Sequence, residues 1–471
     1  MNNCFKSIGV CVTSSSAFNK LVVCCALFSV TFQLSAGEKG APLESKNVVL
    51  LDLRDFIDRI AAESPRILAS RLDVAAADYE ARSAYASYLP HLVGEARIGY
   101  VRGKRLIGFT GLDEPRGGIN NRPEIPVDRS FTQEGPGLVI PVFKEGSFLG
   151  INVPPEVQRK RAEREIIKFR GSLTTSDLVL SATGAYLSSI KATHLLELRR
   201  QHYTVAAKEA ERVENRASDN LATAEELGAA RLLRETSRAS FEAERVSAVY
   251  SFLAVADLLG LNGNQLRIQE AYPKPAALPD FEMVAKLSAL DHPKVRLQEA
   301  AINGAKANVA LQRSRQYPSV KAESFDFQYG DFHGQAANQW VSFMSVSVPV
   351  FDFGEAAFAT RSASVKMRAE SARLLAVRQD VRKELLDAFV ELKQTEAAFA
   401  KANSDVAEQE RIANRLREQA KVDQALLSDL NSAELKLLDS KEALEQAHYD
   451  VLFQYARVQR VSAGAWEWVP R

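Results

Sequence analysis

Few residues of this chain have the types and spacing that chemistry requires. His194 and His202 are eight positions apart in a helical segment, which places them about 12 Å apart, too far to bind one metal ion. We therefore expect two solvent-exposed histidines. The sequence contains no Gly-x-Ser-x-Gly, Walker-type or His-Glu-x-x-His motif. We expect no enzyme activity, no metal site and no cofactor.

The cysteines are confined to the N-terminus. All four lie in the first 25 residues: Cys4, Cys11, Cys24 and Cys25. The remaining chain therefore offers no disulfide, no thiolate metal site and no cysteine nucleophile. Lysines precede an apolar run at residues 21–34 and small residues follow it, so residues 1–37 are predicted to be a signal peptide. A lipoprotein signal, with Cys24 as the lipidated residue, is the alternative.

Charge and hydropathy limit the possible partners. The chain has 60 basic and 59 acidic residues, so no positive excess indicates binding to nucleic acid. Beyond residue 37 no apolar run reaches the ~18 residues that a transmembrane helix needs. If the chain enters a membrane, we expect it to do so with strands.

The helices and strands predicted for this chain are arranged as an internal duplication. Three short matches recur in the same order: residues 65–90 with 293–318, 141–146 with 349–354, and 217–231 with 420–434. Their offsets fall from 228 to 208 to 203, so the first copy holds extra loop residues. Ordered self-similarity of this kind indicates that one structural unit was duplicated.

Each copy is expected to run helix, strand, strand, helix, helix. The first repeat, 38–261, is predicted to contain strands at about 92–102 and 136–143 and long helices at about 155–218 and 221–260. An inter-repeat linker or equatorial segment follows at 262–280. The second repeat, 281–471, is predicted to contain strands at about 319–331 and 339–351 and long helices at about 355–422 and 424–461.

The strands alternate in polarity. Apolar residues take alternate positions, in the first copy at Leu92, Ala96, Ile98 and Tyr100 and in the second at Phe325, Phe327 and Tyr329. Alternation over about ten residues, with the apolar side outward, is typical of strands in membrane barrels. A soluble sheet with one hydrated face has the same pattern.

The helical arms are long and polar. Each runs for roughly 60 residues without proline, or ~90 Å, which is too long and too polar for a hydrocarbon core of ~30 Å. We expect them to project into an aqueous compartment. Four strands cannot close a barrel, because closed membrane barrels have at least ~8. Two chains would give a filled barrel, whereas three give twelve strands and a lumen.

The duplicated plan, the Pro-Val-Phe-Asp-Phe-Gly stretch at 349–354 and the tip-and-return segment before Tyr449 resemble the TolC family of outer-membrane efflux proteins. The resemblance covers essentially the whole mature chain. It implies an α+β membrane protein: a homotrimer with a 12-stranded β-barrel in outer-membrane lipid, continuous with a long periplasmic α-helical barrel. It also implies docking to a periplasmic adaptor and to an inner-membrane pump of the RND or ABC type. Small molecules or proteins would be exported.

The resemblance also implies a periplasmic aperture at the helical tips. The acidic pore-lining position of the family matches Asp429 in the second copy and Glu226 in the first. The tip glycine of the family is replaced by Asn220 and Asp423, which both tolerate a left-handed turn. Arg231 matches an arginine that is common in the first return helix.

The sequence departs from the family at three aperture positions. Ser432 stands where a second acid is usual, and Ala420 and Ala425 replace the tyrosine and arginine that tie the closed aperture in some members. A latch of that kind is therefore not expected here.

A periplasmic coiled-coil scaffold or adhesion protein with a soluble sheet is the alternative function. The strands separate the two hypotheses, because a scaffold needs no outward apolar strand face. A scaffold would also wash off membranes in high salt and carbonate.

Overall fold

The computed structural model describes residues 49–104, 126–261, 266–269, 271–331, 336–421 and 426–463. The predicted signal peptide at 1–37, the alternative lipidation at Cys24 and the tip residue Asp423 lie outside the described residues. The account below concerns the compact unit that begins at Val49.

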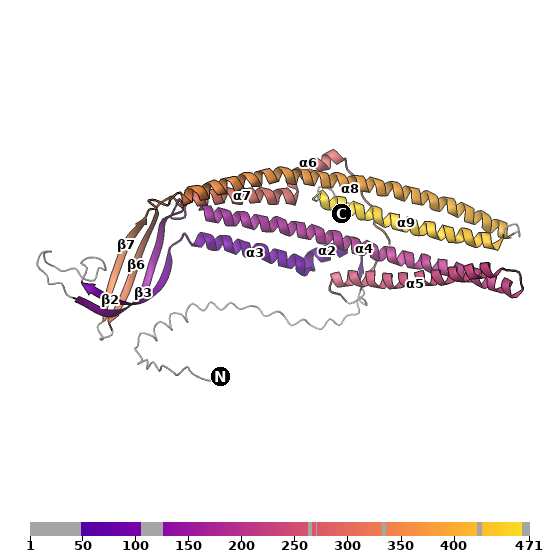
Figure 1. The fold of residues 1–471 in the computed structure, drawn as a ribbon, viewed down its shortest axis with the longest axis horizontal. Helices are drawn as coiled ribbons and strands as arrows, with labels where there is room; N and C mark the ends of the chain where they lie inside the picture. The colour runs from indigo at the N-terminus through magenta and orange to yellow at the C-terminus, as the bar shows by residue number, and fades with distance from the viewer. Residues whose placement is uncertain are drawn as a thin grey trace, which may run out of the picture. The chain divides into compact units, whose positions relative to one another are not determined.

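Four long strands form one antiparallel sheet in the order β2-β3-β6-β7 (Figure 1). They are β2 (His91–Lys104), β3 (Pro126–Lys144), β6 (Ser319–Asp331) and β7 (Ala336–Ser347), and the short β4 (Ser147–Phe148) pairs with the end of β3. β3 begins ten residues before the expected start at 136, because β2 pairs with it along its whole length. Pairing to a neighbour, more than intrinsic propensity, sets the length of a strand.

The register puts the apolar positions of β2 and β6 on opposite faces of the sheet. Leu92 lies opposite Leu138, which lies opposite Ser324, so the apolar side of β2 continues into the polar side of β6. Phe325 shares the other face with Gly137, and its ring occupies the space where a Cβ atom of Gly137 would lie. The expectation of one uniformly apolar outward face is therefore wrong for this sheet. Since the side-chain period is two, a shift of one residue in pairing reverses the face.

The turn after β3 recurs before the second long helix. Glu145 and Gly146 have φ angles of 53° and 81°, and Phe353 and Gly354, 208 residues later, have 50° and 85°. In the second copy the Asp352 carboxylate accepts hydrogen bonds from the backbone N–H groups of Gly354 and Ala356, at 3.0 and 2.9 Å. This carboxylate satisfies amides that would otherwise be unpaired at the helix start.

Eight helices are described. They are α2 (Leu53–Glu63), α3 (Pro65–Ala86), α4 (Pro155–Ser218), α5 (Ala224–Leu258), α6 (Phe281–Asp291), α7 (Pro293–Ser314), α8 (Glu355–Lys421) and α9 (Leu427–Val461). With 64 and 67 residues, α4 and α8 are each about 100 Å long. No helix in the described part of the chain is both long enough and apolar enough to cross a membrane.

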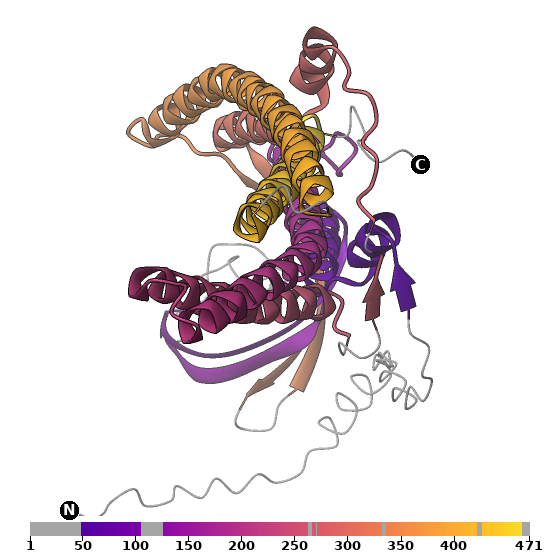
Figure 2. The ribbon, with the colours of Figure 1, turned by 90° about the vertical axis from the view of Figure 1, so that its right-hand side faces the viewer.

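The long helices pair into two hairpins, α4–α5 and α8–α9 (Figures 1 and 2). The shorter helices α3 and α7 pack on α4, and α7 also packs on α8. Extended backbone at Ser64 and His292, each followed by a proline at the first helical position, separates α2 from α3 and α6 from α7 in the same way. A small parallel pair, β1 (Val49–Leu51) with β5 (Leu266–Ile268), joins the first helices to the segment between the repeats.

One hydrophobic core unites the two hairpins at their middle. It gathers buried side chains from α2, α4, α8 and α9, among them Phe56, Tyr186, Leu385 and Leu452. The Tyr186 hydroxyl donates to the Leu51 carbonyl oxygen at 3.1 Å, which ties β1 to α4. Nearer the tips the core divides into two small clusters, one in each hairpin. The hairpins therefore share apolar packing at the middle of the helices and separate toward the tips.

Candidate functional site

The tip of the α4–α5 hairpin is a closed turn. Asn220 has a φ angle of 61°, in the left-handed region that the sequence predicts for this position. The backbone N–H of Leu221 donates to the Arg216 carbonyl oxygen at 2.8 Å, and the Arg216 guanidinium donates to the Leu221 carbonyl oxygen at 2.7 Å. The first bond satisfies a carbonyl group in the last turn of α4, and the two together fix the turn.

Glu226, an expected aperture residue, caps the helix that returns from this tip. The Glu226 N–H donates to the Thr223 hydroxyl, and the Thr223 N–H donates to the Glu226 carboxylate, both at 3.1 Å. This reciprocal pair is a capping box, which satisfies two amides at the start of α5. The carboxylate of Glu226 is exposed, but it is bound to its own helix.

Asp429 occupies the same helical position in the second hairpin without this partner. The residue three positions before it is Leu426, whose side chain cannot cap a helix. Asp429 is exposed, and no hydrogen bond or ion pair of its carboxylate to another described residue is present. Its charge lies in the first turn of α9, where the helix dipole stabilises an acid. Of the two expected aperture acids, Asp429 is thus the one whose carboxylate is not held by a cap.

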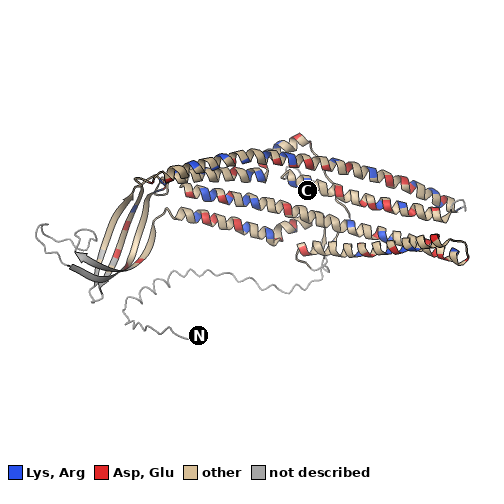
Figure 3. Ribbon diagram, viewed as in Figure 1, with Lys and Arg blue, Asp and Glu red and all other residues tan. Residues whose placement is uncertain are grey.

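Arg231 lies beyond the first turn of α5 and pairs across the hairpin. Its Nε donates to the Glu214 carboxylate on α4 at 2.9 Å. In the second hairpin, 203 residues later, Arg417 of α8 donates to Glu434 of α9 at 3.0 Å. The same pair of positions therefore forms an ion pair in both copies, with the charges reversed. Figure 3 shows that acidic and basic residues are distributed along all the long helices.

A polar seam joins α4 to α9 between the shared core and the tips. It consists of four contacts: Glu209 with Asn431, His202 with Asp439 at 3.6 Å, Arg199 with Glu442 at 2.7 Å, and His194 with Glu445 at 3.0 Å. The expectation of two solvated histidines is therefore wrong for His202, which is 9 % exposed and bonded to Ser237 of α5 at 3.1 Å. Burial lowers the pKa of His202.

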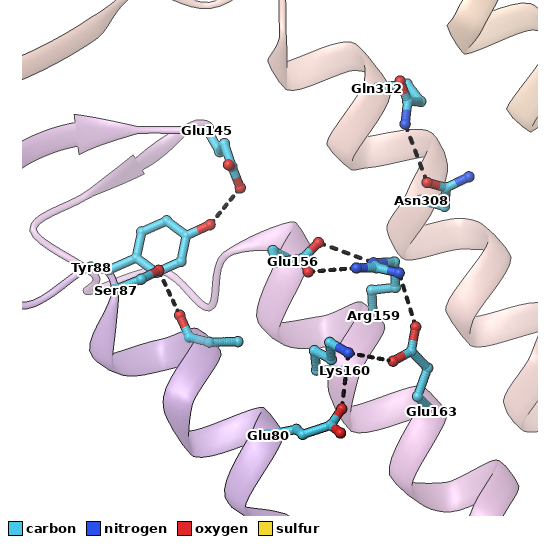
Figure 4. Close-up of polar contacts among 11 residues, drawn as sticks. Glu80, Ser87, Tyr88, Glu145, Glu156, Arg159, Lys160, Glu163, Asn308 and Gln312 are labelled. Carbon is cyan, nitrogen blue, oxygen red and sulfur yellow. Dashed lines mark hydrogen bonds and ion pairs between the residues drawn. The ribbon is translucent and has the colours of Figure 1, made fainter. Parts of the chain in front are cut away.

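A second polar cluster holds the strands to the helices (Figure 4). Tyr88, buried at the end of α3, donates its hydroxyl proton to Glu145 after β3. Lys144 lies 4.5 Å from the centre of the Tyr88 ring. Burial raises the pKa of Tyr88, so this hydroxyl remains a donor. The cluster fixes the end of β3 on α3.

The first turn of α4 extends this cluster through ion pairs. Arg159 pairs with Glu156 at 2.5 Å and with Glu163 at 2.9 Å (Figure 4). Lys160 pairs with Glu80 of α3 at 3.0 Å. The Lys160–Glu80 pair joins α4 to α3, whereas the Arg159 pairs lie within α4.

A surface groove of about 380 Å³ lies between α4, α8 and α9 near the tips. Its lining is mostly polar and charged: Glu197, Arg200, Gln201, Thr204, Val205, Arg417, Glu434, Leu437, Leu438 and Lys441. Within the described residues no three histidine, cysteine or acidic side chains come together as metal ligands. The arrangement can bind or repel charged surfaces, and it offers no group placed for bond chemistry.

Comparison with known proteins agrees with this geometry. Residues 284–464 match the family described as "Outer membrane efflux protein". The match covers most of the second repeat. No curated protein sequence matches the chain.

Solved structures extend the likeness to the first repeat. A membrane protein from Pseudomonas aeruginosa has a TM-score of 0.70 and 17% identity, over 88% of this chain and 90% of that one. The CmeC outer membrane channel of Campylobacter jejuni has a TM-score of 0.69 and 14% identity, over 88% of this chain and 86% of that one. The MtrE outer membrane channel of Neisseria gonorrhoeae has a TM-score of 0.66 and 16% identity, over 88% of this chain and 89% of that one. At these identities the likeness shows the fold, which is the predicted α+β tunnel fold.

The efflux protein family fixes the broad function. The chain is an outer-membrane efflux channel component, a passive duct rather than an enzyme, whose helical part extends into the periplasm. It works in a trimeric assembly together with an efflux system. The resemblance to outer-membrane efflux proteins, the fold class and the localisation expected from the sequence are confirmed.

Proposed function

We propose that three copies close a twelve-stranded barrel through the two edges of the sheet. Among the described residues β2 and β7 are the end strands of the four-stranded path, so each has one edge whose backbone groups no described strand pairs. Unpaired backbone groups cannot remain exposed to hydrocarbon, because each would cost several kcal/mol. Pairing β7 of one chain with β2 of the next satisfies both edges at once. This pair of open edges is the observation that carries the proposal.

The hairpin tips form the periplasmic aperture of this duct. Asp429 supplies its charge, since three copies place three uncapped carboxylates around one axis. Glu226 and Arg231 hold α5 in place at the same level, through the capping box and the ion pair to Glu214. Asn220 supplies one tip turn, and Asp423, outside the described residues, is assigned to the other.

A periplasmic adaptor docks in the groove between α4, α8 and α9, and through it the duct meets an inner-membrane pump of the RND or ABC type. Two features support this groove as the docking site: it lies toward the tips, and its lining carries charges of both signs. The basic residues are Arg200, Arg417 and Lys441, and the acidic residues are Glu197 and Glu434. A helical partner with charges of both signs could pair along it. Photo-crosslinking from Lys441 in intact cells identifies the protein bound there.

Single-channel recording in planar bilayers tests the aperture. A ring of carboxylates favours cations, so Asp429→Asn should lower the cation selectivity of the channel. Glu418→Gln is the matched control, because Glu418 is exposed near the same tips but pairs with Lys421 at 2.7 Å. Unchanged selectivity in Asp429→Asn would show that Asp429 does not line the aperture. Absence of any conductance from the wild type would contradict the proposed duct.

A further inference from the structure

The two hairpins meet differently along their length. At the middle they share one apolar core, whereas toward the tips each hairpin has its own small cluster. Over the intervening stretch, α4 and α9 are joined by the polar seam defined above. The spacing between the tips of the two hairpins therefore depends on side chains that can change their charge.

Glu442 of α9 is the acid most enclosed in this seam. Its side chain is 11% exposed, and one carboxylate oxygen lies 2.7 Å from the Arg199 guanidinium of α4. The other oxygen, Oε1, is buried without a hydrogen-bond partner among the described residues. A buried carboxylate oxygen without a donor is costly when the group is ionised. A protonated carboxyl would place a neutral group there.

Charged groups face Glu442 from three helices. Arg199 lies on α4, Glu244 on α5, and Asp439 one turn earlier on α9. From α8, Glu410 pairs with the neighbouring Lys441 at 3.0 Å. Burial, reinforced by the two acids and opposed by Arg199, raises the pKa of Glu442 from 4.5 to about 7.

His202 of the seam and the nearby His448 have pKa shifts of the opposite sign. His202 contacts Asp439, and His448 of α9 lies 4.3 Å from Tyr272, measured between ring centres. Burial lowers the pKa of both His202 and His448, so both are neutral in the packed seam at neutral pH. Burial raises the pKa of Glu445, but its interactions with His194, Tyr272 and His448 together outweigh burial, so the pKa is lowered and Glu445 remains ionised.

We propose that the α4–α9 seam is a proton-operated lock: neutral Glu442 keeps the two hairpins packed, and its ionisation separates α9 from α4 toward the tips. The consequence for the aperture rests on the proposed function of the tips. The chemical signal is the proton concentration of the periplasm, which the seam senses directly.

Linkage gives the direction of the response. An acid whose pKa is raised in the packed state stabilises that state below its ordinary pKa, and this contribution is lost as pH rises through about 7. The histidines, whose pKa values are lowered by packing, stabilise the seam above about pH 6.5 and weaken it as pH falls further. The two ranges overlap below pH 6.5, so opening by ionised Glu442 is measured from pH 6.5 to 8.5, where the histidines no longer contribute.

Spin labels across the seam test the lock without requiring channel activity. Lys208 of α4 and Ser432 of α9 are exposed positions on the tip side of Glu442, and the chain has no cysteine beyond residue 25. Both are replaced by labelled cysteine in full trimers diluted with unlabelled chains. Pulsed electron resonance should show the distance lengthening as pH rises, with a midpoint near 7. No change over this range would overturn the proposal.

Two variants identify the responsible group. Glu442→Gln should keep the short distance from pH 6.5 to 8.5, whereas Arg199→Gln should move the midpoint to higher pH because the positive partner is lost. The control Glu235→Gln, an exposed acid paired with Arg234 on its own helix, should titrate like the wild type. A wild-type midpoint in Glu442→Gln would overturn the assignment.

Bilayer recording separates this inference from the proposed function. The open probability of the channel should follow the same midpoint as the label distance. A responsive distance in a protein without conductance would overturn the aperture and leave the lock standing. A conducting channel whose labels do not move with pH would overturn the lock alone.

Discussion

The two helical hairpins occupy equivalent places in the duplicated chain but differ in how they end. The first has a capped return helix, with Thr223 and Glu226 bonded to each other, whereas the second begins at Leu426 and leaves Asp429 exposed. The ion pair behind each tip also reverses its polarity between the copies. At equivalent positions, the acid is therefore held in a cap in the first copy and is uncapped in the second.

Removing the packing beneath the second hairpin should have the largest effect. Leu452 of α9 is 1 % exposed in the shared core, so Leu452→Ala should reduce the free energy of unfolding by about 2–5 kcal/mol. Denaturant unfolding in detergent measures the loss. Leu426→Ala is the control, because Leu426 is 70 % exposed and should change stability by less than ~0.5 kcal/mol. Equal losses in both variants would contradict a core located at the middle of the hairpins.

Breaking the cap should make the first tip resemble the second. Thr223→Ala removes the acceptor for the Glu226 N–H and should cost about 1 kcal/mol. Hydrogen exchange should increase in the first turn of α5 and stay unchanged in the first turn of α9. If both turns respond equally, the tips are not independent.

Exchanging the charges of one ion pair should have the smallest effect. Arg417→Glu places two acids against each other, and adding Glu434→Arg recreates the polarity of the Glu214–Arg231 pair. Because these pairs are partly exposed, the coupling energy from the double-mutant cycle should be about 0.2–1 kcal/mol. A double variant less stable than Arg417→Glu would show that polarity at this level is fixed by other neighbours.

The fold was predictable because the duplication repeats its backbone conformations as well as its sequence. The helix breaks before Pro65 and Pro293 follow from local residue types, and glycine at 146 and 354 suits the turns there. Gly260 and Ala463, 203 residues apart, both have positive φ, which shows that this conformation persists even where glycine is absent.

The polar seam and the sheet faces could not be predicted in this way. The burial of His202 requires α5 and α9 to converge on α4, and the opposite faces of Leu92 and Phe325 depend on strand register. Both are set by contacts between segments far apart in the chain. At the tips, the sequence placed Glu226 and Asp429 at equivalent positions, but the difference between them lies in the residue three positions earlier. A capping box between Thr223 and Glu226 is visible in the sequence and could have identified it.

The stoichiometry of the membrane-extracted protein tests the central claim, that neighbouring chains complete the sheet of each chain. Native mass spectrometry of the complex, extracted from outer membranes in detergent, should give the mass of three mature chains. A single chain, or one recovered from the aqueous fraction without detergent, would contradict closure of the β2 and β7 edges by neighbouring copies.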